Sequence, residues 1–147
     1  MRRAQRSFAL FGAAAAATVA VLATPGFAQA STTAVPAVSK ADLARAITIC
    51  PSGNVCFFTG SNFSGQVCKW SDADPDWQKG AIVCSWSATT NVKSVYNAGT
   101  STSLTGVVYY SGADYTTRKG CTKQQQGGNL AGTYKLRSHE WTDGNCG

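Results

Sequence analysis

The chain has 147 residues, of which 44% are hydrophobic and 14% charged, and a formal net charge of +6. Three of the thirteen basic residues lie at the extreme amino terminus; without them ten basic residues face seven acidic ones, a net charge of +3. A surface this mildly basic, with no arginine-rich stripe, excludes nucleic acid as an expected partner.

The first 30 residues have the pattern of a secretory signal peptide. Three arginines precede an apolar run over residues 8–23, and the small-residue site Ala28-Gln29-Ala30 follows. The run falls short of the roughly 20 residues that a membrane-spanning helix needs. We therefore expect residues 1–30 to be removed and the rest of the protein to be secreted to the extracellular space, with no membrane anchor.

Residues 31–48 contain no aromatic residue and no glycine, and they carry small side chains with scattered charge. We interpret them as a flexible leader or pro-segment before a domain that spans residues 49–147. Within the leader, Ser39 is a candidate helix N-cap, and Asp42 completes a capping-box-like pair. This pattern predicts a helix of one or two turns.

All six cysteines lie in the segment 49–147. An even number in a small exported domain indicates disulfides, because about 100 residues bury only a modest core. Six cysteines allow 15 pairings, but Cys50 and Cys56 enclose a proline and a glycine and are predicted to close a local loop. With one histidine and no C-x-x-C motif, a zinc site is disfavoured and no cofactor is expected. For the other cysteines we hypothesise a sequential pattern, which pairs Cys68 with Cys84 and Cys121 with Cys146.

Two segments of the chain repeat one pattern of residues. Residues 55–65 (VCFFTGSNFSG) and 107–117 (VVYYSGADYTT) both place two adjacent aromatics before a Ser/Thr-Gly step, then an Asn or Asp, then a third aromatic. A strand that ends in aromatics, followed by a polar glycine turn and an aromatic that folds back over it, describes a hairpin that buries its own corner. The duplication predicts one supersecondary unit used twice.

Short apolar stretches separated by turns of Gly, Ser, Asn and Asp predict an all-β domain. Four strands are expected in the first half, over residues 55–59, 66–70, 82–86 and 92–96. Four more are expected in the second half, over residues 106–110, 118–122, a weak segment near Leu130, and 135–138. Four strands make one Greek key, and two keys packed face to face make a sandwich. The final strands of the two halves match each other, at residues 92–95 and 136–138.

Two further features have structural rather than chemical interpretations. The run from Asp72 to Asp76 begins like an EF-hand loop, but Trp77 stands at the glycine position. We expect Asp74 or Asp76 to cap a turn and Trp77 to pack inward. His139 lies in a polar stretch and is expected at the surface. Without a G-x-S-x-G or H-E-x-x-H motif, the sequence indicates a protein that is not an enzyme.

The first repeated segment resembles a known corner. Phe58, Phe63 and Gly65 fit the βγ-crystallin Greek-key signature of an aromatic, four residues, an aromatic, any residue and a glycine. Glycine at the last position allows the positive φ that the folded hairpin needs. In the second copy Thr117 stands where glycine is expected, so this corner is predicted to be strained or differently shaped.

Together with the Cys50–Cys56 loop, the segment 94–97 and the signal peptide, this corner makes the chain similar to the small exported metalloproteinase inhibitors of streptomycetes. The resemblance implies a disulfide-stapled βγ-crystallin-like domain that acts as a monomer and inhibits an extracellular zinc endopeptidase. In that family, a substrate-like loop after the second aromatic corner contains the reactive bond, which follows a cysteine. The implied inhibitory loop comprises Arg118, Lys119, Gly120, Cys121, Thr122 and Lys123, with Cys121-Thr122 as the nearest counterpart of the reactive bond.

This implied loop departs from the family pattern in two ways. The family closes the loop with a second cysteine a few residues on, whereas the next cysteine here is Cys146. Thermolysin-like enzymes favour a bulky apolar residue after the cut, whereas Thr122 is small and polar. Both departures concern the loop and leave the predicted scaffold unchanged.

Two other functions are alternatives. A calcium-binding structural βγ-crystallin domain would use adjacent Asn/Asp residues, two spacers and Ser/Thr-Ser, because calcium prefers several oxygen ligands from a short loop. Residues 90–95 retain only Asn91 and Ser94 of that pattern, so these two are weak calcium candidates, and no other metal site is expected. The second alternative is a secreted antimicrobial or cell-wall-binding protein without protease inhibition.

Overall fold

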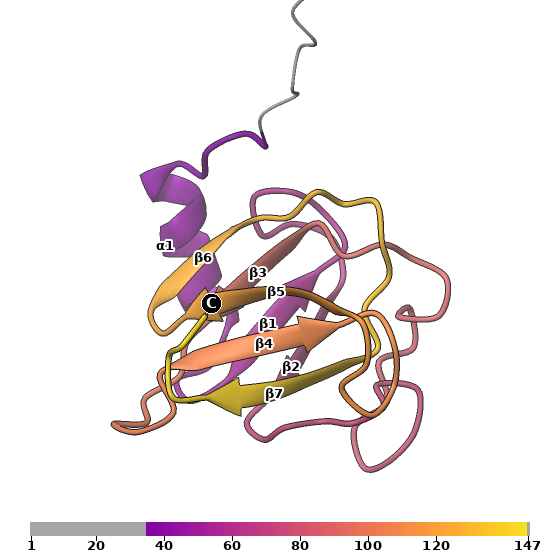
Figure 1. Cartoon of the computed structure of the whole chain (residues 1–147). Helices are drawn as coiled ribbons and strands as arrows, with labels where there is room; N and C mark the ends of the chain where they lie inside the picture. The colour runs from indigo at the N-terminus through magenta and orange to yellow at the C-terminus, as the bar shows by residue number, and fades with distance from the viewer. Residues whose placement is uncertain (1–34, 147) are drawn as a thin grey trace, which may run out of the picture. The chain divides into compact units, whose positions relative to one another are not determined.

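The computed structural model describes residues 35–146, which contain one helix and seven strands (Figure 1). The predicted signal peptide and the first part of the predicted leader lie outside the described residues. No helix within residues 35–146 has the length and apolar character to cross a membrane. The elements are α1 (Lys40–Ile49), β1 (Val55–Phe58), β2 (Val67–Trp70), β3 (Ser94–Asn97), β4 (Gly106–Tyr110), β5 (Arg118–Lys123), β6 (Gln126–Asn129) and β7 (Ser138–Thr142).

The strands form two antiparallel sheets. One sheet has four strands in the order β2-β1-β3-β6, and the other has three in the order β5-β4-β7. In each half the last strand returns beside the first, β3 next to β1 and β7 next to β4, as the fourth strand of a Greek key does. The predicted all-β architecture of two antiparallel sheets is confirmed.

Each half of the chain contributes one segment to the sheet of the other half. β6, from the second half, pairs with β3 of the first. In return, residues 74–77 of the first half run along β7, where the amides of Asp74 and His139 each donate to the other's carbonyl oxygen at 3.0 Å. The amide of Trp77 then donates to the Arg137 carbonyl at 2.8 Å. The two halves therefore cannot separate without breaking contacts in both sheets.

Three of the predicted strands differ from those in the structure. Residues 82–86 form bends and turns rather than a strand. The amide of Cys84 donates to the Trp77 carbonyl, and the amide of Ser87 donates to the Cys84 carbonyl, so this stretch folds on itself. In the second half, β6 precedes Leu130 and β7 begins at Ser138. Hydrogen-bonded register with distant strands, rather than apolar content, sets these bounds.

The two aromatic corners have the same shape. The rings of Phe58 and Phe63 meet edge to face with centroids 5.7 Å apart, and those of Tyr110 and Tyr115 do so at 5.9 Å. In each corner a serine from the last strand of that half accepts a hydrogen bond from the amide of the second aromatic: Ser94 at 3.0 Å and Ser138 at 3.2 Å. This equivalence confirms the repeated unit and the matched final strands.

Thr117 adopts the left-handed conformation of its counterpart Gly65, with a φ of 60° against 78°. The prediction of a differently shaped second corner is therefore wrong. The shape is imposed by the corner's own hydrogen bonds, of which the one from the Gly112 amide to the Thr116 carbonyl measures 3.0 Å. The predicted strain is present, because the Cβ of a threonine crowds the backbone in this region.

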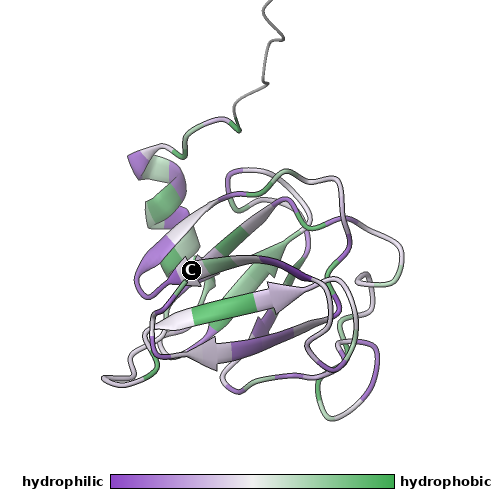
Figure 2. Cartoon of the chain, in the orientation of Figure 1, coloured by the Kyte–Doolittle hydropathy of each residue, from purple (hydrophilic) through white to green (hydrophobic). Residues whose placement is uncertain are grey.

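The main core cluster lies between the two sheets and is rich in aromatic side chains. Trp70 and Trp77 stack there with ring centroids 4.5 Å apart, beside Phe57 and Tyr109. The predicted inward packing of Trp77 is confirmed. His139 packs against the same rings with 0% of its surface exposed, so the prediction of a surface histidine is wrong. β7 turns this side chain inward, although most of the strand is coloured hydrophilic in Figure 2.

The predicted cap of α1 is confirmed, and the helix is longer than predicted. The Ser39 hydroxyl accepts a hydrogen bond from the amide of Asp42 at 3.1 Å and donates one to its carboxylate at 2.6 Å. Ala46 is fully buried in a second apolar cluster, together with Cys56 and Phe58 of β1. The second half of the predicted flexible leader is thus a helix that packs on the domain, because a small alanine lets it approach closely.

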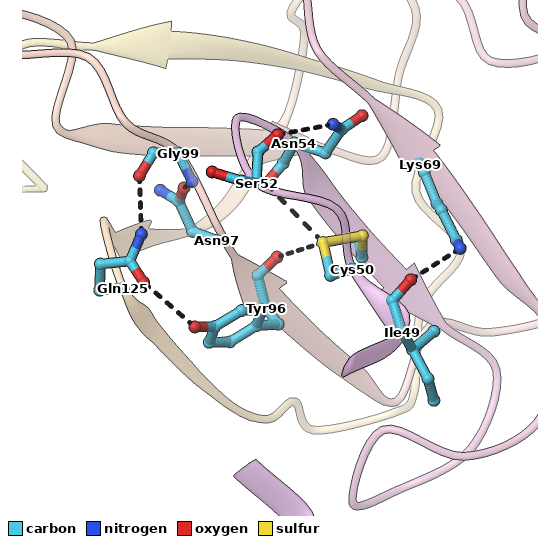
Figure 3. The surroundings of a disulfide bond; sticks show 10 residues. Ile49, Cys50, Ser52, Asn54, Lys69, Tyr96, Asn97, Gly99 and Gln125 are labelled. Carbon is cyan, nitrogen blue, oxygen red and sulfur yellow. Dashed lines mark hydrogen bonds between the residues drawn. A yellow bond between two sulfur atoms is a disulfide. The ribbon is translucent and has the colours of Figure 1, made fainter. Parts of the chain in front are cut away.

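Three disulfides follow the sequential pattern hypothesised from the sequence, Cys50–Cys56, Cys68–Cys84 and Cys121–Cys146. Figure 3 shows the surroundings of the first disulfide, which joins the end of α1 to β1. Beside it, the Lys69 ammonium donates to the Ile49 carbonyl at 2.7 Å. The helix end is therefore tied to both β1 and β2.

Candidate inhibitory site

The predicted inhibitory loop, residues 118–123, is a β-strand. It forms β5 at the edge of the three-stranded sheet, where Cys121 lies opposite Val108 and Thr122 opposite Val107 of β4. The expectation of a loop is corrected in this respect, because pairing with β4 holds the segment extended. Its position after the second aromatic corner agrees with the sequence prediction, and its inhibitory role stays a prediction.

Two contacts attach β5 to the carboxyl-terminal residues of the chain. The Cys121–Cys146 disulfide joins the middle of the strand to that segment. At the start of the strand, the Arg118 guanidinium donates to the Cys146 carbonyl at 2.6 Å. The strand is therefore held by a covalent bond, a charged hydrogen bond and a β-ladder.

The side chains of β5 give this edge a basic surface. Arg118, Lys119 and Lys123 are exposed, and the Lys119 ammonium lies 5.6 Å from the centre of the Tyr134 ring. Only glycine fits at position 120, because a Cβ there would lie 2.5 Å from the hydroxyl of Tyr109 on the neighbouring strand. Burial raises the pKa of the Tyr109 phenol, so this ring is neutral beneath the strand.

The outer edge of β5 is occupied at Thr122. The Asn97 side-chain amide donates to the Thr122 carbonyl at 3.0 Å, which connects the edge of one sheet to the end of β3 in the other. A tight turn follows, in which Gln125 has a φ of 58° and its amide donates to the Asn97 carbonyl at 2.8 Å. The Cys121-Thr122 bond is thus held by β4 along one edge of the strand and by Asn97 along the other.

A hollow of about 440 Å³ lies where the chain passes from β5 to β6. Lys123 and Thr122 line one side, and Gly127, Gly128 and Leu130 line the other. A Cβ on Gly128 would meet nothing within 4 Å, so this glycine leaves open space on its side of the strand. β5 and β6 belong to different sheets, so the turn between them carries the chain from one sheet to the other (Figure 1).

The aspartates that follow β2 have structural roles. Asp74 accepts hydrogen bonds from the Trp70 indole and from the amide of Asp76, both at 2.8 Å. Asp76 accepts one from the amide of Gln78 at 3.1 Å. The predicted turn caps are therefore confirmed. The Arg137 guanidinium donates twice to Asp76 at 2.9 Å and lowers the pKa of that carboxyl to about 2.

The weak calcium candidates are engaged in contacts within the protein. Ser94 is buried, and its hydroxyl donates to the Gly60 carbonyl at 2.7 Å while it closes the first corner. The Asn91 amide donates to the Gly132 carbonyl at 3.0 Å. Within residues 35–146, no three His, Cys, Asp or Glu side chains gather into a group suited to a metal ion. Calcium binding at Asn91 and Ser94 stays a prediction that no contact favours.

These features define a small disulfide-bonded β-sandwich that presents a rigid, extended edge strand. A model of peptidase inhibitor family I36 matches residues 44–123 of the chain. The match covers more than half of the sequence and ends at the last residue of β5. The protein therefore belongs to this family. Because the family consists of peptidase inhibitors and not of enzymes, the protein is a peptidase inhibitor and its partner is a peptidase.

A solved structure described as "Evolution of the eye lens beta-gamma-crystallin domain fold" is similar to the chain. The sequences are 15% identical, the match covers 64% of this chain and 90% of that chain, and the TM-score is 0.47. No curated protein sequence matches the chain at a significant level. The fold is defined here by the chain's own strand order and paired corners.

Proposed function

We propose that the protein is secreted and, as a monomer, inhibits an extracellular zinc endopeptidase, with β5 as the strand that the peptidase contacts. Membership of a peptidase inhibitor family and the resemblance to metalloproteinase inhibitors support the target class. Three disulfides support an extracellular location, because such bonds persist in oxidising compartments. The observation that carries the role of β5 is its extended conformation at a sheet edge, fixed by the Cys121–Cys146 bond.

Extended geometry favours inhibition for an entropic reason. Peptidases bind the segment that they cut as an extended strand, and a chain that is already extended loses little conformational entropy on binding. In β5 the ladder to β4 and the disulfide remove that freedom before the encounter. The exposed Arg118, Lys119 and Lys123 provide further contacts along the strand.

The same attachments predict slow turnover of a bound inhibitor. Hydrolysis of the Cys121-Thr122 bond would leave Cys121 joined to Cys146, and Thr122 connected through Asn97 to the other sheet. Neither new chain end would leave the cleft freely. A cut inhibitor therefore stays bound long enough to block the next substrate.

The test is a panel of purified peptidases titrated with the protein without its predicted signal peptide, residues 31–147, called the exported chain below. The proposal predicts stoichiometric loss of activity for a thermolysin-type zinc endopeptidase and no loss for serine peptidases. Inhibition of serine peptidases alone would refute the zinc target class. If no peptidase in the panel is inhibited, inhibition itself is refuted.

A further inference from the structure

We propose that a second segment, residues 79–83, enters the peptidase cleft and supplies the bulky apolar side chain that β5 lacks. This segment is called the apolar loop below and comprises Lys79, Gly80, Ala81, Ile82 and Val83. The inference rests on the proposed inhibition of a zinc endopeptidase and identifies a further surface through which it occurs. Sequence reasoning assigned part of this stretch to a strand, and the structure shows it as irregular chain.

The apolar loop exposes two large hydrophobic side chains next to each other. Ile82 is 45% exposed and Val83 is 58% exposed, and the other three residues of the loop are exposed as well. Five large hydrophobic side chains are exposed between residues 35 and 146, and Ile82 and Val83 are the sole sequence neighbours among them. Single exposed apolar residues are common on proteins, whereas two neighbouring ones offer a partner a larger apolar contact.

The backbone of residues 80–83 within the loop is free to pair with a partner, whereas the Lys79 amide donates to the Asp76 carbonyl at 2.8 Å. Across the described part of the chain, no hydrogen bond involves residues 80–83. A peptidase cleft binds its segment through main-chain hydrogen bonds, so unpaired amides and carbonyls are what the cleft requires. At Thr122 in β5, by contrast, the carbonyl already accepts a hydrogen bond from Asn97.

Both ends of the apolar loop are fixed to the core. On one side Trp77 is fully buried, and its amide donates to the Arg137 carbonyl at 2.8 Å. On the other side Cys84 is 1% exposed, is bonded to Cys68 of β2, and donates its amide to the Trp77 carbonyl at 2.8 Å. The loop therefore leaves and re-enters the core at one point, so its ends lose no freedom when a partner binds.

Gly80 gives the loop a backbone turn that other residues disfavour. Its φ of 90° lies in the region that disfavours side chains, and a Cβ there would meet nothing within 4 Å. A hollow of about 360 Å³ lies beside the loop, lined by Gly80 and Ile82 on one side and by Trp70 and Pro75 on the other. The exposed loop thus borders a recess. It belongs to the long connection from β2 to β3 (Figure 1).

The partner that fits is a cleft with an apolar pocket just beyond the catalytic metal. Thermolysin-type endopeptidases prefer a bulky apolar residue after the cut, and Ile82 or Val83 provides it where Thr122 does not.

Hydrolysis of the peptide bond before Ile82 or Val83 would consume one water, break one C–N bond, and leave a new carboxylate and a new amino group. The Cys68–Cys84 disulfide would keep both ends attached, so the cut inhibitor would remain one covalent molecule.

The test compares inhibition constants of the exported chain and its variants against a thermolysin-type endopeptidase. The double variant Ile82→Ser/Val83→Ser is expected to weaken inhibition at least about tenfold, because two apolar anchors are lost. The matched control is Leu104→Ser, since Leu104 is 43% exposed on a separate connection, and it is expected to change nothing. Unchanged melting temperatures confirm that all the variants are folded.

The outcomes separate this inference from the proposed function. If the parent chain inhibits and the double variant inhibits equally well, the apolar loop is refuted while the proposed function stands. If the parent chain inhibits no zinc endopeptidase, both are refuted. Loss of potency together with loss of a self-associated form, measured by sedimentation, would assign the apolar loop to contact between copies and also refute the inference.

Mapping the cut bond gives a second measurement. After long incubation with the enzyme, mass spectrometry of the reduced inhibitor is expected to find a new amino terminus at Ile82 or Val83. A new terminus at Thr122 alone, with none at Ile82 or Val83, would confine the cut to β5 and refute the role of the apolar loop.

Discussion

The indole Nε1 of Trp77 donates a hydrogen bond to Nδ1 of His139 at 2.8 Å, in the core between the two sheets. An indole nitrogen only donates, so Nδ1 carries no proton and Nε2 carries one. Nε2 lies 3.0 Å from the Asp72 carbonyl, which accepts that proton. The neutral tautomer of one buried ring thus joins the connection after β2 to β7, and burial lowers the pKa of His139 to about 4.

The first prediction is that stability falls in acid because of His139. In the unfolded chain the imidazole binds a proton near pH 6.5, whereas in the folded protein it does so near pH 4. The stabilisation is complete above pH 6.5 and is lost as the pH falls toward 4, a change of about 3 kcal/mol. Urea unfolding at a series of pH values measures it.

A matched variant isolates this histidine. His139→Gln retains a side-chain acceptor and donor without titrating, so its free energy of unfolding should change less between pH 7 and pH 4.5. The carboxyl of Asp76 titrates lower, near pH 2, and does not interfere. The prediction is contradicted if the free energy of unfolding changes equally with pH in the parent protein and in the variant.

The second prediction concerns the strain at Thr117. Thr117→Gly relieves a left-handed threonine with a φ of 60° and is expected to stabilise the protein by about 1 kcal/mol after the entropy cost of glycine. Gly65→Thr is the mirror control and should destabilise, because a Cβ there would lie 2.4 Å from the Thr59 hydroxyl. Denaturant unfolding at neutral pH measures both variants. A destabilised Thr117→Gly would show that the threonine makes compensating contacts.

The third prediction tests the disulfide next to the apolar loop. The double variant Cys68→Ala/Cys84→Ala removes a bond between cysteines 16 residues apart in sequence. Its loss should lower the free energy of unfolding by about 3 kcal/mol. Potency should fall as well, because the apolar loop loses one fixed end. The control Cys50→Ala/Cys56→Ala removes the disulfide at the end of α1, which joins cysteines 6 residues apart in sequence. At a temperature where both variants are folded, this control should inhibit as well as the parent protein. Equal potency for the two variants would contradict this prediction.

The fourth prediction asks what β5 contributes. If the peptidase cuts after Cys121, Thr122→Val places an apolar side chain of the same shape in its pocket and should tighten inhibition about fivefold. Thr122→Ser, which stays polar, is the control and should not tighten it. An inhibition constant unchanged by Thr122→Val, beside a large loss for Ile82→Ser/Val83→Ser, would remove β5 from the cleft and leave the apolar loop there.

The sequence by itself determined the features that depend on local or repeated patterns. Two copies of one aromatic corner predicted the repeated unit, since each corner is closed largely by residues of its own half. The spacing of Cys50 and Cys56 predicted the first disulfide, and Ser39 with Asp42 predicted the start of α1. Family membership was likewise indicated by the corner together with the first cysteine loop.

The tertiary structure decided what depends on partners far away in the chain. His139 is buried because residues 74–77 of the first half run along β7 of the second half. No local sequence pattern predicts that the two halves exchange segments in this way. Pairing with β4 made a strand of the implied inhibitory loop, and the lack of any strand partner left residues 79–83 irregular and exposed. Hydrogen bonds between distant segments make these choices, because a β-strand acquires its partners only when the sheet assembles.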